Sequence, residues 1–67
     1  MNLIINGKSV DIDSSIQTVS QLLESRDLHE KVVIVELNKK ILQKQDHEKA
    51  LLSEGDLLEI VSFVGGG

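Results

Sequence analysis

The apolar and polar positions near the start of the chain alternate in the pattern of two short strands. Residues 3–5 and residues 10–12 both follow a period of two. The Asn6-Gly7 pair between them is a strong hairpin signal, because a type I′ turn needs positive φ at both central residues. The chain is therefore predicted to begin with an antiparallel hairpin.

After this hairpin the period changes to that of a helix. Thr18 is followed three residues later by Gln21, which is the spacing of a capping box. Apolar residues at helical spacing between 19 and 23 would line one buried face. The helix is predicted to be short and to end near Arg26 or Asp27.

The second half of the chain begins with two more predicted strands. Residues 32–35 are β-branched throughout and apolar on both faces, which is typical of an interior strand. Asn38-Lys39 predicts a turn into a strand at residues 40–42. Residues 45–50 are ambiguous and could hold a single helical turn.

A tight turn at Glu54-Gly55-Asp56 precedes the last strand, which runs through the apolar stretch 57–64. A hairpin, a helix and then further strands indicate an α+β domain with the helix on one face of a sheet.

Length and composition limit what such a domain can be. Sixty-seven residues make one domain, and a chain this short buries only about 60% of the surface that its unfolded form exposes. The chain has no cysteine, so no disulfide framework is expected. No signal-like N-terminus and no apolar run of the roughly 20 residues needed for a membrane helix are present. A soluble cytoplasmic protein without a membrane partner is the expectation.

The charge distribution argues against a nucleic-acid partner. The net charge is −4, and all the charged side chains after Lys49 are acidic. With one aromatic residue and scattered lysines, the chain offers neither a stacking platform nor a phosphate-tracking stripe. The acidic surface is explained either by attraction to a basic protein partner or by solubility alone.

The sequence contains no catalytic constellation. His29 and His47 lack the spacing to a second histidine or cysteine that a metal site requires, so both are expected to be ordinary surface residues without metal. Ser14-Ser15 and Ser53 have no partner base at a recognisable spacing, and turn chemistry explains them. The chain is therefore not predicted to be an enzyme.

The chain ends on three glycines that directly follow the last apolar strand. Glycine loses more backbone entropy on ordering than any other residue, so three in a row cannot be there to stabilise the fold. They offer a slender arm, on the order of 10 Å long when extended, that presents the Gly67 carboxylate without a Cβ beside it. The other explanation is a frayed terminus or a cloning remnant.

These features together resemble the ubiquitin-like sulfur carriers with a β-grasp fold, and among them the thiamine-biosynthesis (ThiS) family. The resemblance covers the whole chain, from the Asn6-Gly7 hairpin and the helix start at Thr18 to the glycine end. It implies one β-grasp domain at residues 1–64, with a mixed sheet of about five strands and one main helix across one face, and a flexible glycine arm at residues 65–67.

The resemblance also implies a function. The functional glycine pair of the family maps onto Gly66 and Gly67, and Gly65 lengthens the arm. A ThiF-type adenylating enzyme would use ATP and Mg²⁺ to adenylate the Gly67 carboxylate, and a cysteine desulfurase or another persulfide donor would convert it to a thiocarboxylate. A ThiG-type thiazole synthase would then take the sulfur for the thiazole ring of thiamine. The chain would bind no cofactor itself and would act as a cosubstrate, not as a catalyst.

Three alternatives remain open from the residues. The small subunit of molybdopterin synthase shares the fold and the chemistry, although its family is typically longer and often carries proline where this chain has Val64. A ubiquitin-like modifier would be joined to lysines. A plain interaction module would not need its terminal glycine.

The last strand also predicts a recognition surface. Leu58 and Ile60 share one face, whereas Glu59, Val61 and Phe63 share the other. Because a glutamate is rarely buried without a partner, the second face is expected to point outward. Its three residues are candidate partner-binding positions beside the arm, with Phe63 as the anchor. The alternative is a twist or bulge that turns Phe63 into the core.

Overall fold

The computed structural model describes residues 1–28 and 32–63, and its elements lie close to those predicted. In chain order they are β1 (Asn2–Ile5), β2 (Lys8–Asp11), α1 (Val19–Ser25), β3 (Val32–Leu37), β4 (Lys40–Leu42), the 3₁₀-helix η1 (Lys44–Asp46) and β5 (Leu57–Phe63). The ambiguous stretch after β4 thus contains one short helical turn. The predicted α+β class is confirmed.

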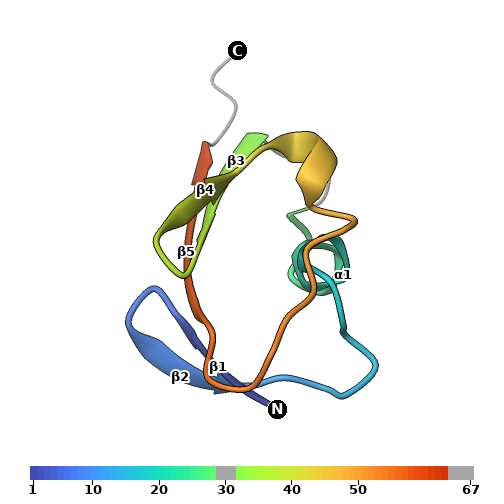
Figure 1. The fold of residues 1–67 in the computed structure, drawn as a ribbon, viewed down its shortest axis with the longest axis vertical. Coiled ribbons are helices and arrows are strands. Elements are labelled where there is room, and N and C mark those ends of the chain that lie inside the picture. The colour runs from blue at the N-terminus through green and yellow to red at the C-terminus, as the bar shows by residue number, and fades with distance from the viewer. Residues whose placement is uncertain (29–31, 64–67) are drawn as a thin grey trace.

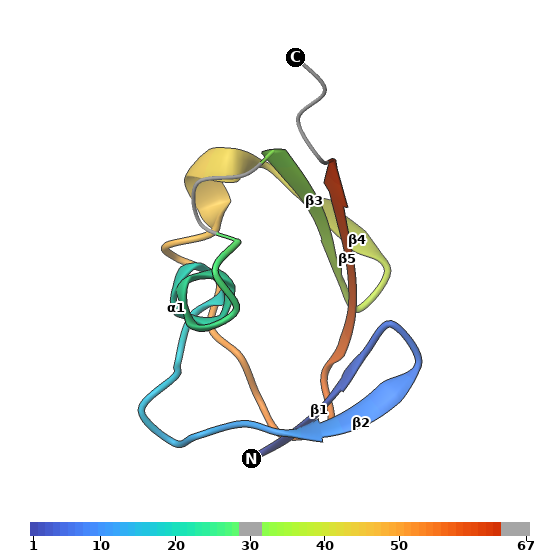
Figure 2. The ribbon, with the colours of Figure 1, turned by 180° about the vertical axis from the view of Figure 1, so that it is seen from behind.

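The five strands form one mixed sheet in the order β2-β1-β5-β3-β4 (Figure 1). Strands β1 and β5 pair in parallel, whereas the other neighbours pair antiparallel. The strand that comes last in the chain therefore lies at the centre of the sheet, and the two ends of the fold meet there. Figure 2 shows the same arrangement from behind, with α1 standing apart from the strands.

Both hairpins use turns in which the two central residues have positive φ. Asn6 and Gly7 have φ angles of 51° and 82°, and Asn38 and Lys39 have angles of 50° and 70°. Turns of this kind match the right-handed twist of the flanking strands. The first turn was predicted from its Asn-Gly pair, and the second places a lysine in a conformation that side chains seldom adopt.

Helix α1 begins at the predicted capping box. The Thr18 hydroxyl accepts a hydrogen bond from the Gln21 backbone N–H at 3.1 Å, and the Gln21 side chain accepts one from the Thr18 N–H at 3.2 Å. The next two orphan donors of the helix are satisfied by the segment after η1. Val19 donates to the Ala50 carbonyl at 3.0 Å, and Ser20 donates to the His47 carbonyl at 2.9 Å. These bonds fasten the segment to the start of the helix.

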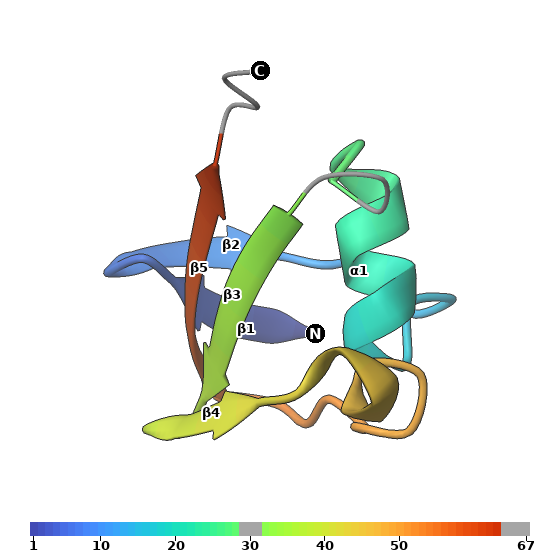
Figure 3. The same ribbon diagram turned by 90° about the horizontal axis from the view of Figure 1, so that it is seen from above.

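The core lies between α1 and one face of the sheet (Figure 3). The helix contributes its apolar stripe, and the strands contribute alternate residues, as the period of two requires. Burying one such side chain stabilises the fold by roughly 1.5–3 kcal/mol. The buried apolar residues are Leu3, Ile5, Ile12, Val19, Leu22, Leu23, Val35, Leu52, Leu58 and Ile60.

Strand β3 is interior in the sheet, as predicted, but only one of its apolar faces is covered. Val35 is fully buried on the face of the sheet that α1 covers. Val32 and Ile34 lie on the opposite face and are 70% and 44% exposed. The physical reason is that α1 covers a single face. The opposite face, which we call the outer face, keeps its apolar side chains in contact with solvent.

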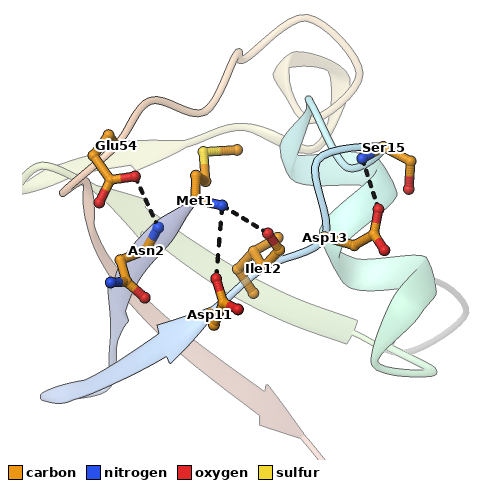
Figure 4. A network of polar contacts seen from close by, with 7 residues as sticks. All are labelled: Met1, Asn2, Asp11, Ile12, Asp13, Ser15 and Glu54. Atoms are coloured by element: carbon orange, nitrogen blue, oxygen red, sulfur yellow. Dashed lines mark hydrogen bonds and ion pairs between the residues drawn. The ribbon is translucent and has the colours of Figure 1, made fainter.

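The first strand is fixed by contacts at the N-terminus (Figure 4). The Met1 amine donates to the Ile12 carbonyl at 2.8 Å and lies 3.7 Å from the Asp11 carboxylate. The Asn2 N–H donates to the Glu54 carboxylate at 2.9 Å, and thus ties β1 to the tight turn before β5. The Asn2–Glu54 bond joins residues that are far apart in the sequence and holds the turn before β5 beside the start of β1.

Candidate functional site

Strand β5 leads the chain toward its C-terminus along the centre of the sheet. Its antiparallel pairing with β3 continues to Phe63, which lies opposite Val32. Its parallel pairing with β1 covers only Leu57 and Leu58. The last residues of β5 therefore run past the end of β1, with β3 alongside them (Figure 3).

Asn6, in the turn of the first hairpin, holds β5 through both its backbone and its side chain. The Asn6 backbone N–H donates to the Leu58 carbonyl at 2.9 Å. Its Nδ2 donates to the Ile60 carbonyl at 3.1 Å, and its Oδ1 accepts from the Ile60 N–H at 2.8 Å. The side-chain amide thus makes the two hydrogen bonds to Ile60 that another residue of β1 would have made. It holds β5 in place two residues beyond Leu58, the last residue of β5 that pairs with β1.

The two faces of β5 are assigned as predicted. Leu58 and Ile60 are buried, and Glu59, Val61 and Phe63 are exposed. Phe63 is 51% exposed and does not close the core, so the alternative of a bulge that turns it inward is wrong. The candidate partner-binding residues therefore lie on the outer face, where a partner can reach them.

The pairing between β3 and β5 adds residues to this surface. On the outer face Val32 lies opposite Phe63, and Ile34 lies opposite Val61. We call these four residues the apolar patch. Apolar side chains that are exposed next to one another tend to mark interaction sites, whereas single exposed apolar side chains are common on any protein surface.

The same register places Glu36 directly opposite Glu59. The sequence analysis singled out Glu59 but missed Glu36. The alternation within residues 32–37 was the available signal, but only the register of β3 against β5 shows that the two carboxylates share one rung.

His47 corrects the expectation that both histidines lie on the surface. Its side chain is only 8% exposed, and its Nε2 atom is buried without a hydrogen-bond partner. The Ser20 N–H donates to the His47 carbonyl at 2.9 Å, which places this residue beside the start of α1, and its side chain lies among residues of α1 and of its own segment. His29, the other histidine, lies outside the described residues.

Among the residues that the structure describes, His47 and Asp13 have shifted pKa values. Burial lowers the pKa of His47 below its ordinary value, and the nearby Lys44 charge adds to this while Asp46 opposes it. Hydrogen bonds from Ser15, including a backbone N–H at 2.9 Å, lower the pKa of Asp13 (Figure 4). Neither group lies on the outer face, and each effect is explained by its local contacts.

The described residues contain no group of three or more histidine, cysteine, aspartate or glutamate side chains placed to hold a metal ion. Within residues 1–28 and 32–63, no helix is long and apolar enough to cross a membrane. Residues 64–67, with the whole glycine arm and Gly67, lie outside the described residues, so the roles given to Gly65, Gly66 and Gly67 stay predictions.

A mixed sheet of this order, with one helix across one face and a central last strand that leads to the C-terminus, defines a ubiquitin-like β-grasp protein. The model of the ThiS family matches residues 3–67. The chain belongs to the ThiS family, the sulfur carriers of thiamine biosynthesis.

Individual relatives agree with this assignment. The sulfur carrier protein ThiS of Bacillus subtilis is 45% identical over 65 residues, which are 97% of this chain and 98% of that protein. The crystal structure of a thiamine biosynthesis protein (ThiS) from Geobacter metallireducens superposes over all of both chains with a TM-score of 0.81 and 33% identity. A thiazole synthase of Paramagnetospirillum magneticum is 39% identical over the whole of this chain, which spans 20% of that longer protein.

Proposed function

We propose that this chain carries sulfur as a thiocarboxylate on its terminal residue, Gly67. The observation that carries the proposal is that the family match extends to residue 67 and so includes all three terminal glycines. The free α-carboxyl group has an ordinary pKa of about 3.3–3.7 and is already an anion at neutral pH, so it needs no base to become a nucleophile. No side chain of the carrier has to act as a catalyst.

In the first step the Gly67 carboxylate attacks the α-phosphorus of ATP bound with Mg²⁺ to an adenylating enzyme. An oxygen–phosphorus bond forms, pyrophosphate leaves, and the product is an acyl-adenylate. The carboxylate itself is a poor electrophile, whereas the adenylate gives the same carbon a good leaving group. The ATP and the Mg²⁺ belong to the adenylating enzyme, and the carrier supplies only the carboxylate.

In the second step a persulfide from a cysteine desulfurase, or from another donor, attacks the activated carbon and displaces AMP. The product is an acyl disulfide. A further thiol cleaves its S–S bond and supplies the two electrons, which leaves the thiocarboxylate on Gly67 and a disulfide on the donor side. The carrier has no cysteine that could compete in this exchange. Thiols and persulfides persist in reducing compartments, which favours a cytoplasmic location.

The proposed acceptor of the sulfur is a thiazole synthase. The similarity to the Paramagnetospirillum thiazole synthase supports this. In that protein, a segment similar to this chain is part of the same polypeptide as the rest of the enzyme. Glu59, Val61 and Phe63 are proposed to contact the partner enzymes beside the arm. Their exposure on the outer face is compatible with that role.

The proposal is tested by intact-mass analysis after incubation with the adenylating enzyme, ATP and a persulfide donor. The expected product has one oxygen replaced by sulfur, and deletion of Gly67 should abolish it while the circular dichroism spectrum stays unchanged. Addition of one alanine after Gly67 is the matched control for chain length and should also abolish the product. A normal yield of thiocarboxylate from the deletion variant would contradict the assignment. An isopeptide adduct on lysines in native cells, without thiocarboxylate, would favour a protein modifier instead.

A further inference from the structure

The outer face of the sheet combines an apolar patch with a pair of like charges. Next to the patch of Val32, Ile34, Val61 and Phe63, the Glu36 carboxylate shares a rung with that of Glu59. Directly opposed side chains in an antiparallel pair have Cβ atoms only about 4.5–5.5 Å apart, and like charges at that distance are destabilising. The single ion pair among residues 1–28 and 32–63 joins the N-terminus to Asp11, so neither glutamate is neutralised by a cation within 4 Å.

These two glutamates also line a shallow pocket. It has a volume of about 160 Å³, and Ile4 and Leu57 provide apolar wall on the side of β1. The volume is far above the roughly 15 Å³ that one water molecule needs. Lys39 lines the same pocket from the β3–β4 turn but forms no ion pair with either carboxylate. The pocket thus offers two carboxylates and an apolar wall, which suit the planar cation and the apolar stem of an arginine.

We infer that the outer face docks on the adenylating enzyme and that a basic side chain of that enzyme enters the pocket between Glu36 and Glu59. The inference rests on the proposed function and adds to it the chemistry of the partner surface. In the free chain no cation of the described residues lies within 4 Å of either carboxylate. A guanidinium placed between them would neutralise both and donate hydrogen bonds to their oxygens.

Charge complementarity points to the adenylating enzyme as the occupant. An enzyme that binds a triphosphate and a carboxylate must surround them with positive charge. The four residues after Phe63 span at most about 14 Å, so the end of β5 has to come close to the rim of that site. An acidic face beside the arm is then attracted to the rim and oriented by it. A second copy of this chain is a poor occupant, because it would bring the same acidic pair against its own.

The test compares Glu36→Gln, Glu59→Gln and the double variant in the thiocarboxylate assay. Glu24→Gln is the matched control, because it removes the same charge from an exposed position on α1. The double variant should raise the KM for the carrier about tenfold at low ionic strength, with kcat unchanged, and the difference should shrink at high salt. The free double variant should unfold at the same or a higher denaturant concentration than the wild type, which separates the effect from a folding defect.

The outcomes separate a failure of this inference from a failure of the proposed thiocarboxylate function. If the wild type forms thiocarboxylate and the double variant has the same KM as Glu24→Gln, the inference is wrong and the proposed function stands. If the wild type forms no thiocarboxylate, the proposed function itself fails. If the wild type self-associates in sedimentation equilibrium and the two substitutions change that equilibrium instead of the KM, the occupant is a second copy and the inference is overturned.

Discussion

The contact between Asn6 and Ile60 is expected to contribute a large part of the stability of this small domain. Asn6 makes two side-chain hydrogen bonds to the Ile60 backbone, of 3.1 and 2.8 Å, in a partly buried position. It also occupies the left-handed region, with a φ of 51°. The substitution Asn6→Gly removes both bonds and keeps a residue that adopts this φ without strain.

The expected loss follows from the structure. Each hydrogen bond contributes about 0.5–1.5 kcal/mol net, so the pair contributes about 2 kcal/mol. Glycine lowers the stability further, because it raises the conformational entropy of the unfolded chain. Part of this loss is offset, because glycine adopts a positive φ without the strain that asparagine has there. A domain of 67 residues has a total stability of about 3–10 kcal/mol, so the variant should remain folded but much weakened.

Urea denaturation followed by circular dichroism measures this loss, because the chain has no tryptophan or tyrosine to serve as a fluorescence probe. With a slope of about 1 kcal/mol per molar urea for so small a protein, the midpoint should fall by about 2 M. Exchange of the Ile60 amide hydrogen gives a local measure. Its protection should fall by a factor of about 30, since each 1.4 kcal/mol is a factor of ten.

Asn38→Gly is the matched control. Asn38 has nearly the same φ, 50°, and its side chain also makes two hydrogen bonds, to Asp56 and to the Leu57 N–H, but both are exposed to solvent. We expect it to cost clearly less than Asn6→Gly, because water replaces exposed partners. Equal losses for the two variants, or a loss below about 0.5 kcal/mol for Asn6→Gly, would refute the reasoning.

Three further predictions concern the patch, the arm and the buried histidine. Phe63→Ala should weaken binding to the adenylating enzyme at least tenfold in titration calorimetry, or about 1.4 kcal/mol, with little change in melting temperature. Leu51→Ala, at an exposed apolar position beside the start of α1, is the control and should leave binding unchanged. A large drop in melting temperature with normal binding would assign Phe63 a structural role. Gly66→Val should slow adenylation more than Gly65→Ala, because a side chain meets the partner's channel closer to the reacting carboxylate; equal rates for Gly66→Val and the wild type would show that no tight channel exists. Acidification through pH 6.5 should lower the free energy of unfolding, because there the unfolded chain binds a proton at His47 that the folded chain, with its lowered pKa, does not. Urea titrations from pH 7.5 to 5.5 should show this slope, and the same slope in His47→Gln would contradict it.

The sequence by itself determined the local elements and, for β5, which face of the strand is buried. The Asn6-Gly7 turn, the Thr18–Gln21 capping box and the two faces of β5 all follow from signals that act over a few residues. Such signals are readable because backbone conformation and the periods of 2 and 3.6 depend on near neighbours. Together with the glycine end they also suggested the family, which the comparisons then established.

The tertiary structure alone decided which elements meet. The parallel pairing of β1 with β5 joins segments from the two ends of the chain, and no local pattern specifies it. The exposure of the outer side of β3 was likewise not readable from its sequence, which is apolar on both sides, because it depends on one helix covering only one face of the sheet. The burial of His47 depends on the packing of its segment beside the start of α1, and the approach of Glu36 to Glu59 follows from the β3–β5 register. In each case the energy depends on a partner distant in sequence, so it is set only once the whole sheet and helix have come together.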